Sequence, residues 1–489
     1  MTSAPTKSST ERRTRSGAGQ PSWPFVIVAN RLPVSLTRRK GEKHWTTSPG
    51  GLVSALTPIA QRAHGAWVGW SGSVDDRLEP FEHDAIAQVP VTISRQDHHD
   101  FYQGFCNRTL WPLYHDAVQN PEYHRHWWRS YVAVNERFAR MVAETVQADG
   151  AVWVQDYQLQ LVPALLRALR PDLRIGFFLH IPFPPAELFA RLPWRRQVLE
   201  GLLGADVIGF QTERNRGNFL RVVGQYTRAQ ASDAGPIRHD GRRLQAAAYP
   251  ISIDFELYES VALAPDTEPR VERLRQRLGS SRKVILGIDR LDYTKGIDHR
   301  LRAFHELLLS GLVKPSDAVM VQVAVPSRER VAEYAELRRR VEELVGQING
   351  EFGEVGVAVV HYVRRNLTPE NLVAMYRTGD VMMVTPLCDG MNLVAKEYVA
   401  TRFDNSGTLV LSEFAGAAEE LTDALLVNPH DVDGIGAAIL SALTMDPVEA
   451  AGRMAKMRAI VRGHTVHDWA RSFVADLVPA RQRRSILGG

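Results

Sequence analysis

The sequence predicts an α/β protein in which two doubly wound parallel sheets face a central cleft. The chain has 489 residues, more than one hydrophobic core normally organises, so two domains are expected. Short apolar runs alternate with longer amphipathic stretches, which is the pattern of a parallel sheet covered by helices. The pattern breaks at 249–256 (YPISIDFE), where a proline precedes a new alternating series.

The expected strands are apolar on both faces because helices cover both sides of each sheet. In the first half they lie at 25–30, 67–71, 151–156, 174–180 and 205–210. In the second half they lie at 283–289, 318–325, 356–361, 380–385 and 408–412. Helical patterns fill the gaps at 123–147, 158–170, 212–228, 297–311, 326–348 and 431–444. Between the halves, 231–250 is polar and hairpin-like.

This pattern predicts four segments along the chain. A basic tail at 1–22 is too rich in Ser, Thr and Gly to bury itself and is expected to be disordered. A first domain covers 23–252 and a second covers 253–460. The last segment, 461–489, is expected to form a helix that returns to the first domain.

The charge distribution argues against a nucleic-acid partner. The net charge is +4, but +3 of it lies in residues 1–22, so the rest of the chain is almost neutral. A phosphate-tracking surface needs a larger basic excess. An Arg- and Ser-rich start also occurs in transit peptides, although a solvated tail is the favoured interpretation.

The apolar and cysteine patterns favour the cytoplasm. No apolar run is long enough to span a bilayer, and the N-terminus lacks the apolar segment of a secretory signal, so no membrane partner is expected. Cys106 and Cys388 are far apart and belong to no CxxC pair. A disulfide framework is therefore excluded, and a reducing compartment fits.

Six polar residues follow predicted strands at the edge of the sheets where ligands bind in such folds. Each half of the chain contributes three of them, so a cleft between the domains would receive both sets. This pattern predicts a site for two ligands without naming them. The six residues are Arg31, Asp156 and His180 in the first half, and Arg290, Arg328 and Asp389 in the second.

The segment 288–297 (IDRLDYTKGI) places two cations beside the start of a helix. Arg290, Lys295 and a helix N-terminus together suit a diphosphate, because all three favour negative charge. An ordinary surface pair of Arg290 with Asp289 or Asp292 is equally compatible with the spacing.

The segment 385–398 (TPLCDGMNLVAKEY) predicts an anion site at a helix start. Asp389-Gly390 makes a tight turn, and Asn392 is a suitable N-cap for the next helix, whose first amides then face the cleft. Glu397 could accept hydrogen bonds from sugar hydroxyls of a bound nucleotide. The alternative is simple helix capping with Lys396 and Glu397 on a solvent face, which suits Lys396 better than Glu397.

The remaining motifs give little information about function, and the absence of some motifs argues against particular enzyme classes. The Gly50-Gly51 pair allows close approach to a phosphate or sugar, but most such pairs are only turns. No GxGxxG, Walker, HExxH or GxSxG motif is present, which counts against dinucleotide oxidoreductases, P-loop NTPases, zinc proteases and serine hydrolases. Asp431 and Asp433 resemble a metal clamp but suit helix caps better, and no metal site is expected.

Nine motifs across residues 25–475 resemble the trehalose-6-phosphate synthases, which are retaining glycosyltransferases with a two-domain, Rossmann-like fold of the GT-B type. Actinobacterial members are the most similar, given the basic Ser/Thr-rich start. The motifs are ANRLPV (29–34), GGL (50–52), WVGWSG (67–72), LWP (110–112), FFLHIPFP (177–184), GFQT (209–212), RLDYTKG (290–296), DGMNLVAKEY (389–398) and LSEFAGAAEEL (411–421).

The resemblance implies a role for each matching residue. The acceptor site would comprise Arg31, Tyr102 and Arg328 at the phosphate, Asp156 at the hydroxyls and Trp111 lining the pocket. Catalytic groups would be His180, Arg290, Lys295 and Asp389, with His180 and Asp389 beside the transferred glucose. The donor site would comprise Gly50, Gly51, Arg290, Lys295, Leu367, Asp389, Gly390, Met391, Asn392, Leu393, Val394, Ala395, Lys396 and Glu397.

One position departs from the family pattern. Many members read HDY before the acceptor aspartate, whereas this chain reads Gln155-Asp156-Tyr157. The aspartate is kept, so altered neighbours rather than lost activity are expected.

The implied reaction transfers glucose, with retention, from UDP-glucose, or from ADP- or GDP-glucose, to glucose 6-phosphate. No cofactor or metal is implied, and the family suggests a homotetramer. Two alternatives stay open: a related synthase that uses another phosphorylated acceptor such as glycerol 3-phosphate, and a catalytically silent sugar-phosphate sensor. The presence of Arg290, Lys295 and Glu397 argues against the sensor.

Overall fold

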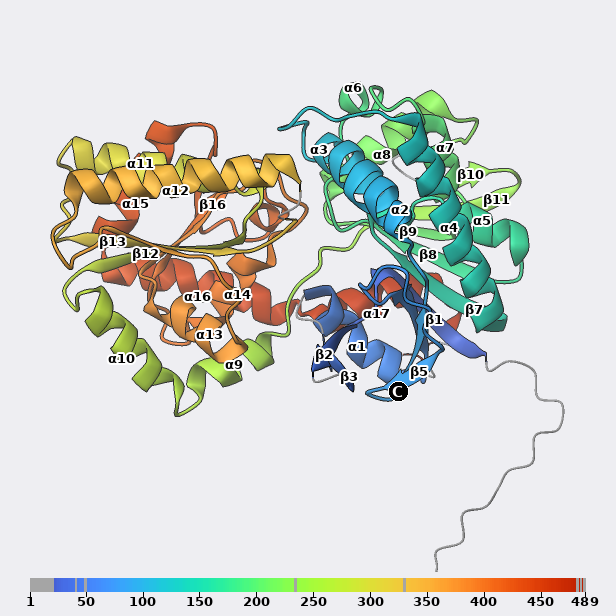
Figure 1. Ribbon diagram of the computed structural model, residues 1–489, viewed down its shortest axis with the longest axis horizontal. Helices are drawn as coiled ribbons and strands as arrows, with labels where there is room; N and C mark the ends of the chain where they lie inside the picture. The colour runs from blue at the N-terminus through green and yellow to red at the C-terminus, as the bar shows by residue number, and fades with distance from the viewer. Residues whose placement is uncertain are drawn as a thin grey trace, which may run out of the picture.

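The computed structural model describes residues 22–39, 42–47, 51–232, 235–328, 331–480, 483 and 486. The predicted tail at 1–22 therefore lies outside the described residues except for Ser22. Figure 1 shows two bodies, each a sheet with helices on its faces, one coloured blue to green and the other mainly yellow to red. The predicted α/β class with parallel sheets is confirmed.

The first sheet has the order β10-β11-β9-β8-β7-β1-β4-β6-β5, with β1 buried near its middle. Its strands run parallel except at the two ends, where β10 and β5 pair antiparallel with their neighbours. The segment expected to resemble a hairpin does form one, β10 and β11. The strands are β1 (Trp23–Arg31), β4 (Ala66–Trp70), β5 (Phe81–His83), β6 (Ile86–Pro90), β7 (Val146–Gln155), β8 (Arg174–Phe178), β9 (Val207–Phe210), β10 (Ile237–His239) and β11 (Arg242–Ala248).

The second sheet is entirely parallel, with the order β14-β13-β12-β15-β16-β17. The strand order reverses between β12 and β15, and ligands bind beyond the strand ends at such a switch point. A separate antiparallel pair, β2 (Val34–Arg39) and β3 (Glu42–Thr47), precedes α1. The six strands are β12 (Lys283–Arg290), β13 (Ala318–Val325), β14 (Val360–Val363), β15 (Val381–Val384), β16 (Thr408–Ser412) and β17 (Leu425–Val427).

Helices connect the strands in both halves. In the first half they are α1 (Gly51–Arg62), α2 (Arg95–Asp97), the π-helix η1 (His98–Leu110), α3 (Trp111–Tyr114), α4 (Arg125–Thr145), η2 (Tyr157–Leu159), α5 (Val162–Leu169), α6 (Ala186–Phe189), α7 (Arg195–Leu202) and α8 (Glu213–Tyr226). In the second half they are α9 (Phe255–Leu263), α10 (Thr267–Leu278), η3 (Tyr293–Lys295), α11 (Ile297–Leu309), α12 (Ala332–Phe352), α13 (Pro369–Thr378), α14 (Leu393–Thr401), η4 (Gly416–Glu419), α15 (Val432–Thr444), α16 (Pro447–Gly463) and α17 (Val466–Leu477). None of the helices in the described ranges is long and apolar enough to cross a membrane.

Two predicted elements are displaced. The helix expected from 326 begins at Ala332, because Pro326 follows the strand and Arg328 adopts a φ of 47° that ends regular structure there. The strand expected at 356–361 lies at 360–363, because Gly356, at a φ of 83°, belongs to a turn.

The last helix, α17, packs under the first sheet although α16 belongs to the second half (Figure 1). Phe473 stacks on Trp153 of β7 with ring centroids 4.4 Å apart, and Trp469 lies 5.1 Å from the same ring. The amide of Val466 donates to the carbonyl of Ile253, so the two crossings between the halves run side by side. The exact domain bounds stay a prediction.

Candidate functional site

A cavity of about 600 Å³ lies between the carboxyl ends of the two sheets. All six predicted strand-end residues line it, together with two aromatic residues that the resemblance singled out. The chain thus brings together, from segments far apart in sequence, Arg31, Tyr102, Trp111, Asp156, His180, Arg290, Arg328 and Asp389.

Asp156 is fixed at the floor of the cavity by its neighbours in the sheet. Its φ of 71° is unusual for a residue with a side chain, and its backbone amide donates to the carbonyl of Phe178 over 2.8 Å. Its Oδ1 accepts from the amide of His180 at 3.1 Å. Burial raises the pKa of Asp156 to about 6, against the opposing effect of backbone hydrogen bonds from Tyr157 and His180 and of the charge of Arg328. A ligand hydroxyl that donates to this carboxylate would favour its ionised form.

Arg31 and Tyr102 form one end of the cavity. The guanidinium of Arg31 lies 4.9 Å from the ring centre of Trp70, and burial lowers its pKa. Gly72, at a φ of 93°, leaves the space that the guanidinium needs, because a Cβ there would lie 2.1 Å from Nη2 of Arg31. Tyr102 projects from η1 and meets Trp70 edge-on at 6.0 Å. These contacts hold a cation and a phenol beside each other.

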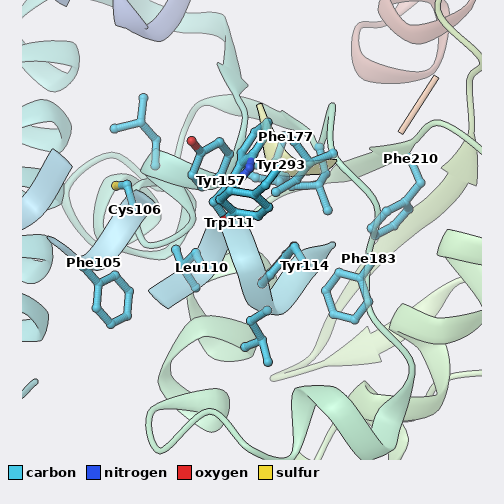
Figure 2. Close-up of a cluster of buried hydrophobic side chains, with 14 of the residues drawn as sticks. Phe105, Cys106, Leu110, Trp111, Tyr114, Tyr157, Phe177, Phe183, Phe210 and Tyr293 are labelled. Carbon is cyan, nitrogen blue, oxygen red and sulfur yellow. The ribbon is translucent and has the colours of Figure 1, made fainter. Parts of the chain in front are cut away.

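Arg328 reaches the same end from the second half. Its guanidinium stacks on Trp111 at 3.8 Å and donates to the hydroxyls of Tyr334 at 2.5 Å and Tyr157 at 3.2 Å. It also pairs with Asp292 at 3.3 Å. Figure 2 draws Trp111 and Tyr157 in one buried cluster with Tyr293, whose segment lies in the second half. Arg328 is thus positioned jointly by both halves.

Asp292 makes this arrangement electrostatically stable. Burial alone would raise its pKa, but the charges of Arg328, Arg290 and Lys295 outweigh that effect and lower it to about 2. The carboxylate therefore stays ionised and holds Arg328 at neutral pH.

Arg290 lines the cavity, and Lys295 lies behind it through its contact with Asp389, which also lines the cavity. Lys295 pairs with Asp389, and its carbonyl accepts from the buried Arg300 over 2.7 Å. The suggested surface pairs of Arg290 do not form: Asp289 pairs with Arg300 at 2.8 Å, and Asp292 with Arg328. Arg290 itself is exposed and, within the described ranges, has no ion pair. Its guanidinium lies 5.6 Å from the ring centre of Trp111.

The start of α14 follows Asp389, which lines the cavity, and one prediction about it is corrected. Asn392 occupies the N-cap position at a φ of 69°, but its side chain does not cap the helix as predicted. Its left-handed backbone lets the chain turn sharply from Gly390 into the helix. Gly390 packs against His180, where a Cβ would lie 2.0 Å from the carbonyl oxygen. Without a side-chain cap, the first amides of α14 suit an anion.

Lys396 and Glu397 face different surroundings. The alternative that places Lys396 on a solvent face is wrong: its side chain is fully buried, pairs with Glu420 at 2.8 Å and donates to the carbonyl of Ile251. That ammonium group is therefore held by protein groups. Glu397 accepts from the hydroxyl of Tyr376 at 2.6 Å, and burial raises its pKa.

The remaining predicted positions are less informative. Gly50 lies outside the described residues, whereas Gly51 begins α1. Leu367 is half-buried and packs against a hydrophobic cluster that includes Leu286 and Tyr376. Asp431 caps α15 through Gly434 at 2.9 Å, as its interpretation as a cap predicts. In the described segments, no group of three or more His, Cys, Asp or Glu residues is arranged to hold a metal.

Sequence reasoning missed two supporting residues. His115 is fully buried against Trp111, its Nδ1 lies 2.7 Å from that residue's carbonyl, and its Nε2 has no partner in the described structure. Burial lowers its pKa to about 4, although Asp389 opposes this. The sequence did not reveal that Arg300 is buried, because an arginine on an amphipathic helix normally faces solvent. Nothing in the spacing distinguishes either residue.

Residues 24–478 match the profile of Glycosyltransferase family 20. A protein of Mycolicibacterium vanbaalenii named trehalose-6-phosphate synthase is 53% identical over 465 residues, covering 92% of this chain and 95% of its own. A UDP-forming α,α-trehalose-phosphate synthase from Burkholderia xenovorans, solved with glucose 6-phosphate, shares 36% identity and a TM-score of 0.85, covering 93% of this chain and 99% of its own. A structure from E. coli bound with UDP-2-fluoro glucose has 35% identity and a TM-score of 0.85, covering 93% and 98%.

Proposed function

Because the chain belongs to glycosyltransferase family 20, we propose that it transfers glucose from UDP-glucose to glucose 6-phosphate and so makes trehalose 6-phosphate. The chain is a retaining glycosyltransferase. The name of the mycobacterial relative and the ligands of the two solved structures support this choice of substrates. Leu367, which is half-buried, is the one described residue that we assign to the base of the nucleotide. ADP-glucose and GDP-glucose therefore remain alternative donors.

The observation that carries the proposal is that cations from both halves of the chain line one cavity together with neutral and acidic groups. We assign one end of this cavity to the acceptor and the other to the donor. One end holds Arg31, Tyr102 and Arg328, which suit the phosphate of the acceptor. Between the ends, Asp156 accepts acceptor hydroxyls, while His180 and Asp389 hold the transferred glucose. Trp111 lines the wall of the acceptor pocket.

The other end suits the donor diphosphate. Arg290 is exposed and has no ion pair in the described structure, Lys295 stands beside it, and the amides from Met391 to Val394 begin α14. Glu397 lies farther along that helix and accepts the ribose hydroxyls. Gly50-Gly51 and the main chain of the run from Leu393 to Glu397 complete the donor contacts.

The proposed chemistry follows from this placement. The bond from the anomeric carbon to the diphosphate oxygen breaks, and the acceptor hydroxyl forms a new bond on the same face. The leaving diphosphate takes the hydroxyl proton. Arg290, Lys295 and the helix start stabilise the charge that develops on the leaving group, and this is usually the largest catalytic contribution. Closure of the two halves excludes water and suppresses hydrolysis.

The proposal also covers cofactors, cellular location, assembly and domain bounds, and it rests there on these cations or on the family. The cations supply the charge that a metal would otherwise provide, so we expect no metal or other cofactor to be needed. We also propose a cytoplasmic homotetramer with no nucleic-acid or membrane partner, and the domain bounds 23–252 and 253–460.

The test is product analysis with the purified chain and parallel donors and acceptors. UDP-, ADP- and GDP-glucose are each combined with glucose 6-phosphate, glycerol 3-phosphate or glucose, without added metal. Of the three acceptors, we expect only glucose 6-phosphate to give a phosphorylated non-reducing disaccharide. Product from glycerol 3-phosphate would support the alternative synthase. Binding of glucose 6-phosphate without any product would support the sensor.

A further inference from the structure

Gln155, the last residue of β7, has two features that the proposed reaction leaves unused. Its side chain is fully buried, and its Oε1 lies 2.9 Å from Nε2 of His180. Its amide nitrogen has no hydrogen-bond partner within the described structure. A buried amide group without a partner is uncommon in native proteins and calls for an explanation. Because Gln155 lines the cavity, a bound ligand can supply the partner.

The sheet fixes the two side chains relative to each other. β7 and β8 run parallel, and Gln155 pairs with Phe178, two residues before His180. The amide of His180 is held by Asp156, and its ring lies 4.6 Å from that of Phe178 and 6.1 Å from that of Trp469. The position of the His180 ring is therefore set by main chain and packing, while its rotation depends on Gln155.

The His180 ring is neutral, and so one of its nitrogens must be an acceptor. Burial lowers the pKa of His180 to about 3, well below neutrality. A neutral imidazole carries one N–H donor and one lone-pair acceptor, and the partner of one nitrogen decides which is which. With Oε1 of Gln155 accepting, the proton lies on Nε2 and the lone pair on Nδ1.

We propose that Gln155 is a positioning and specificity-determining residue for the transferred sugar: its Oε1 holds His180 in the Nε2–H form, and its amide nitrogen donates directly to a sugar oxygen. Nδ1 of His180 then accepts from a sugar hydroxyl. Gln155 and His180 together recognise a neutral hexose, whose hydroxyl groups both donate and accept hydrogen bonds. The proximity of Gly390 to the His180 carbonyl places this pair beside the segment that leads into α14. The inference rests on the proposed function for the identity of the sugar.

Two substitutions separate the two roles. Gln155→Leu removes both hydrogen bonds, whereas Gln155→Glu keeps an acceptor for Nε2–H but has no donor for the sugar. We expect Gln155→Leu to lower kcat/KM for UDP-glucose roughly 10- to 100-fold, because it leaves buried donors and acceptors unpaired. Gln155→Glu should lower it at least about tenfold, because the donor is lost and a buried negative charge is added beside His180. KM for glucose 6-phosphate should not change in either variant.

The tautomer gives a readout that a purely structural role would not move. In the full chain with ¹⁵N-labelled histidine, the His180 signals are assigned by comparison with His180→Gln. We expect the proton on Nε2 in the wild type and in Gln155→Glu, and a mixture of tautomers in Gln155→Leu. A proton on Nδ1 in the wild type, or unchanged His180 signals in Gln155→Leu, would overturn the inference.

Gln160→Leu is the matched control. Gln160 is also a buried glutamine, but it does not line the cavity: its amide nitrogen donates to the carbonyl of Tyr157, and its Oε1 accepts from the hydroxyl of Tyr114. It should lower thermal stability without changing kcat/KM of the folded protein. If the wild type makes no trehalose 6-phosphate, the proposed function fails, while the tautomer and calorimetric binding of UDP-glucose still decide the role of Gln155. An active wild type with equally active Gln155→Leu overturns only the inference.

Discussion

Arg328 and Arg290 both place a guanidinium over the ring of Trp111, at 3.8 Å and 5.6 Å, yet they are held very differently. Arg328 is bonded to Asp292, Tyr157 and Tyr334, and its side chain is 8% exposed. Arg290 is exposed and has no ion pair in the described structure. The proposed acceptor end thus has its cation fixed by protein groups, whereas the proposed donor end keeps a cation that pairs with no carboxylate in the described structure. Arg328 should matter for folding and binding, and Arg290 for chemistry.

The largest effect is expected at Arg290. Arg290→Ala should lower kcat by two or more orders of magnitude, because the charge developing on the leaving diphosphate loses a fixed cation. The melting temperature should not change, since no ion pair in the described structure is broken. Steady-state kinetics and calorimetry measure the two quantities. A rate like that of the wild type would remove Arg290 from catalysis.

The opposite pattern is expected at Arg328. Arg328→Ala leaves Asp292 buried without its cation, which should lower the free energy of unfolding by about 3–5 kcal/mol. It should also raise KM for glucose 6-phosphate. Denaturant unfolding and kinetics test both expectations. Arg31→Ala is the comparison: it should raise the same KM roughly 10- to 100-fold with little loss of stability. Equal stability of the two variants would contradict the distinction.

Asp156 makes the acceptor end sensitive to pH. Its raised pKa of about 6 means that the carboxyl group gains a proton as the pH falls through 6, and a protonated group accepts hydroxyls poorly. kcat/KM for glucose 6-phosphate should therefore fall about fivefold from pH 6 to pH 5 through this group. The sugar phosphate itself titrates near the same pH. Asp156→Asn should be weakly active and retain only the titration of the phosphate; an unchanged profile would exclude Asp156.

The smallest effect is expected at Glu397. Glu397→Gln keeps the shape of the side chain and an acceptor for Tyr376 but removes the charge and one acceptor oxygen. KM for UDP-glucose should rise about threefold to tenfold, with KM for glucose 6-phosphate unchanged as an internal control. A larger change in KM for glucose 6-phosphate than in KM for UDP-glucose would show that the two ends are not independent.

The sequence predicted which residues line the site better than it predicted the contacts of those residues. Strand patterns placed Arg31, Asp156 and Arg290 at sheet edges, because residues that follow parallel strands must gather there. They did not reveal that Asp292 would hold Arg328, since these residues are 36 apart and meet only when the second half folds. Lys396 was misjudged because a lysine beside a glutamate on a helix usually faces water, whereas here Glu420 offsets its burial.

The most direct test of the central claim is the linkage formed from labelled donor. The wild-type chain is incubated with UDP-[1-¹³C]glucose and glucose 6-phosphate, and the product is observed by ¹H and ¹³C NMR. We expect a single phosphorylated disaccharide whose two anomeric carbons are joined through one oxygen, both in the α configuration. Release of free labelled glucose alone, or a β-configured product, would contradict it.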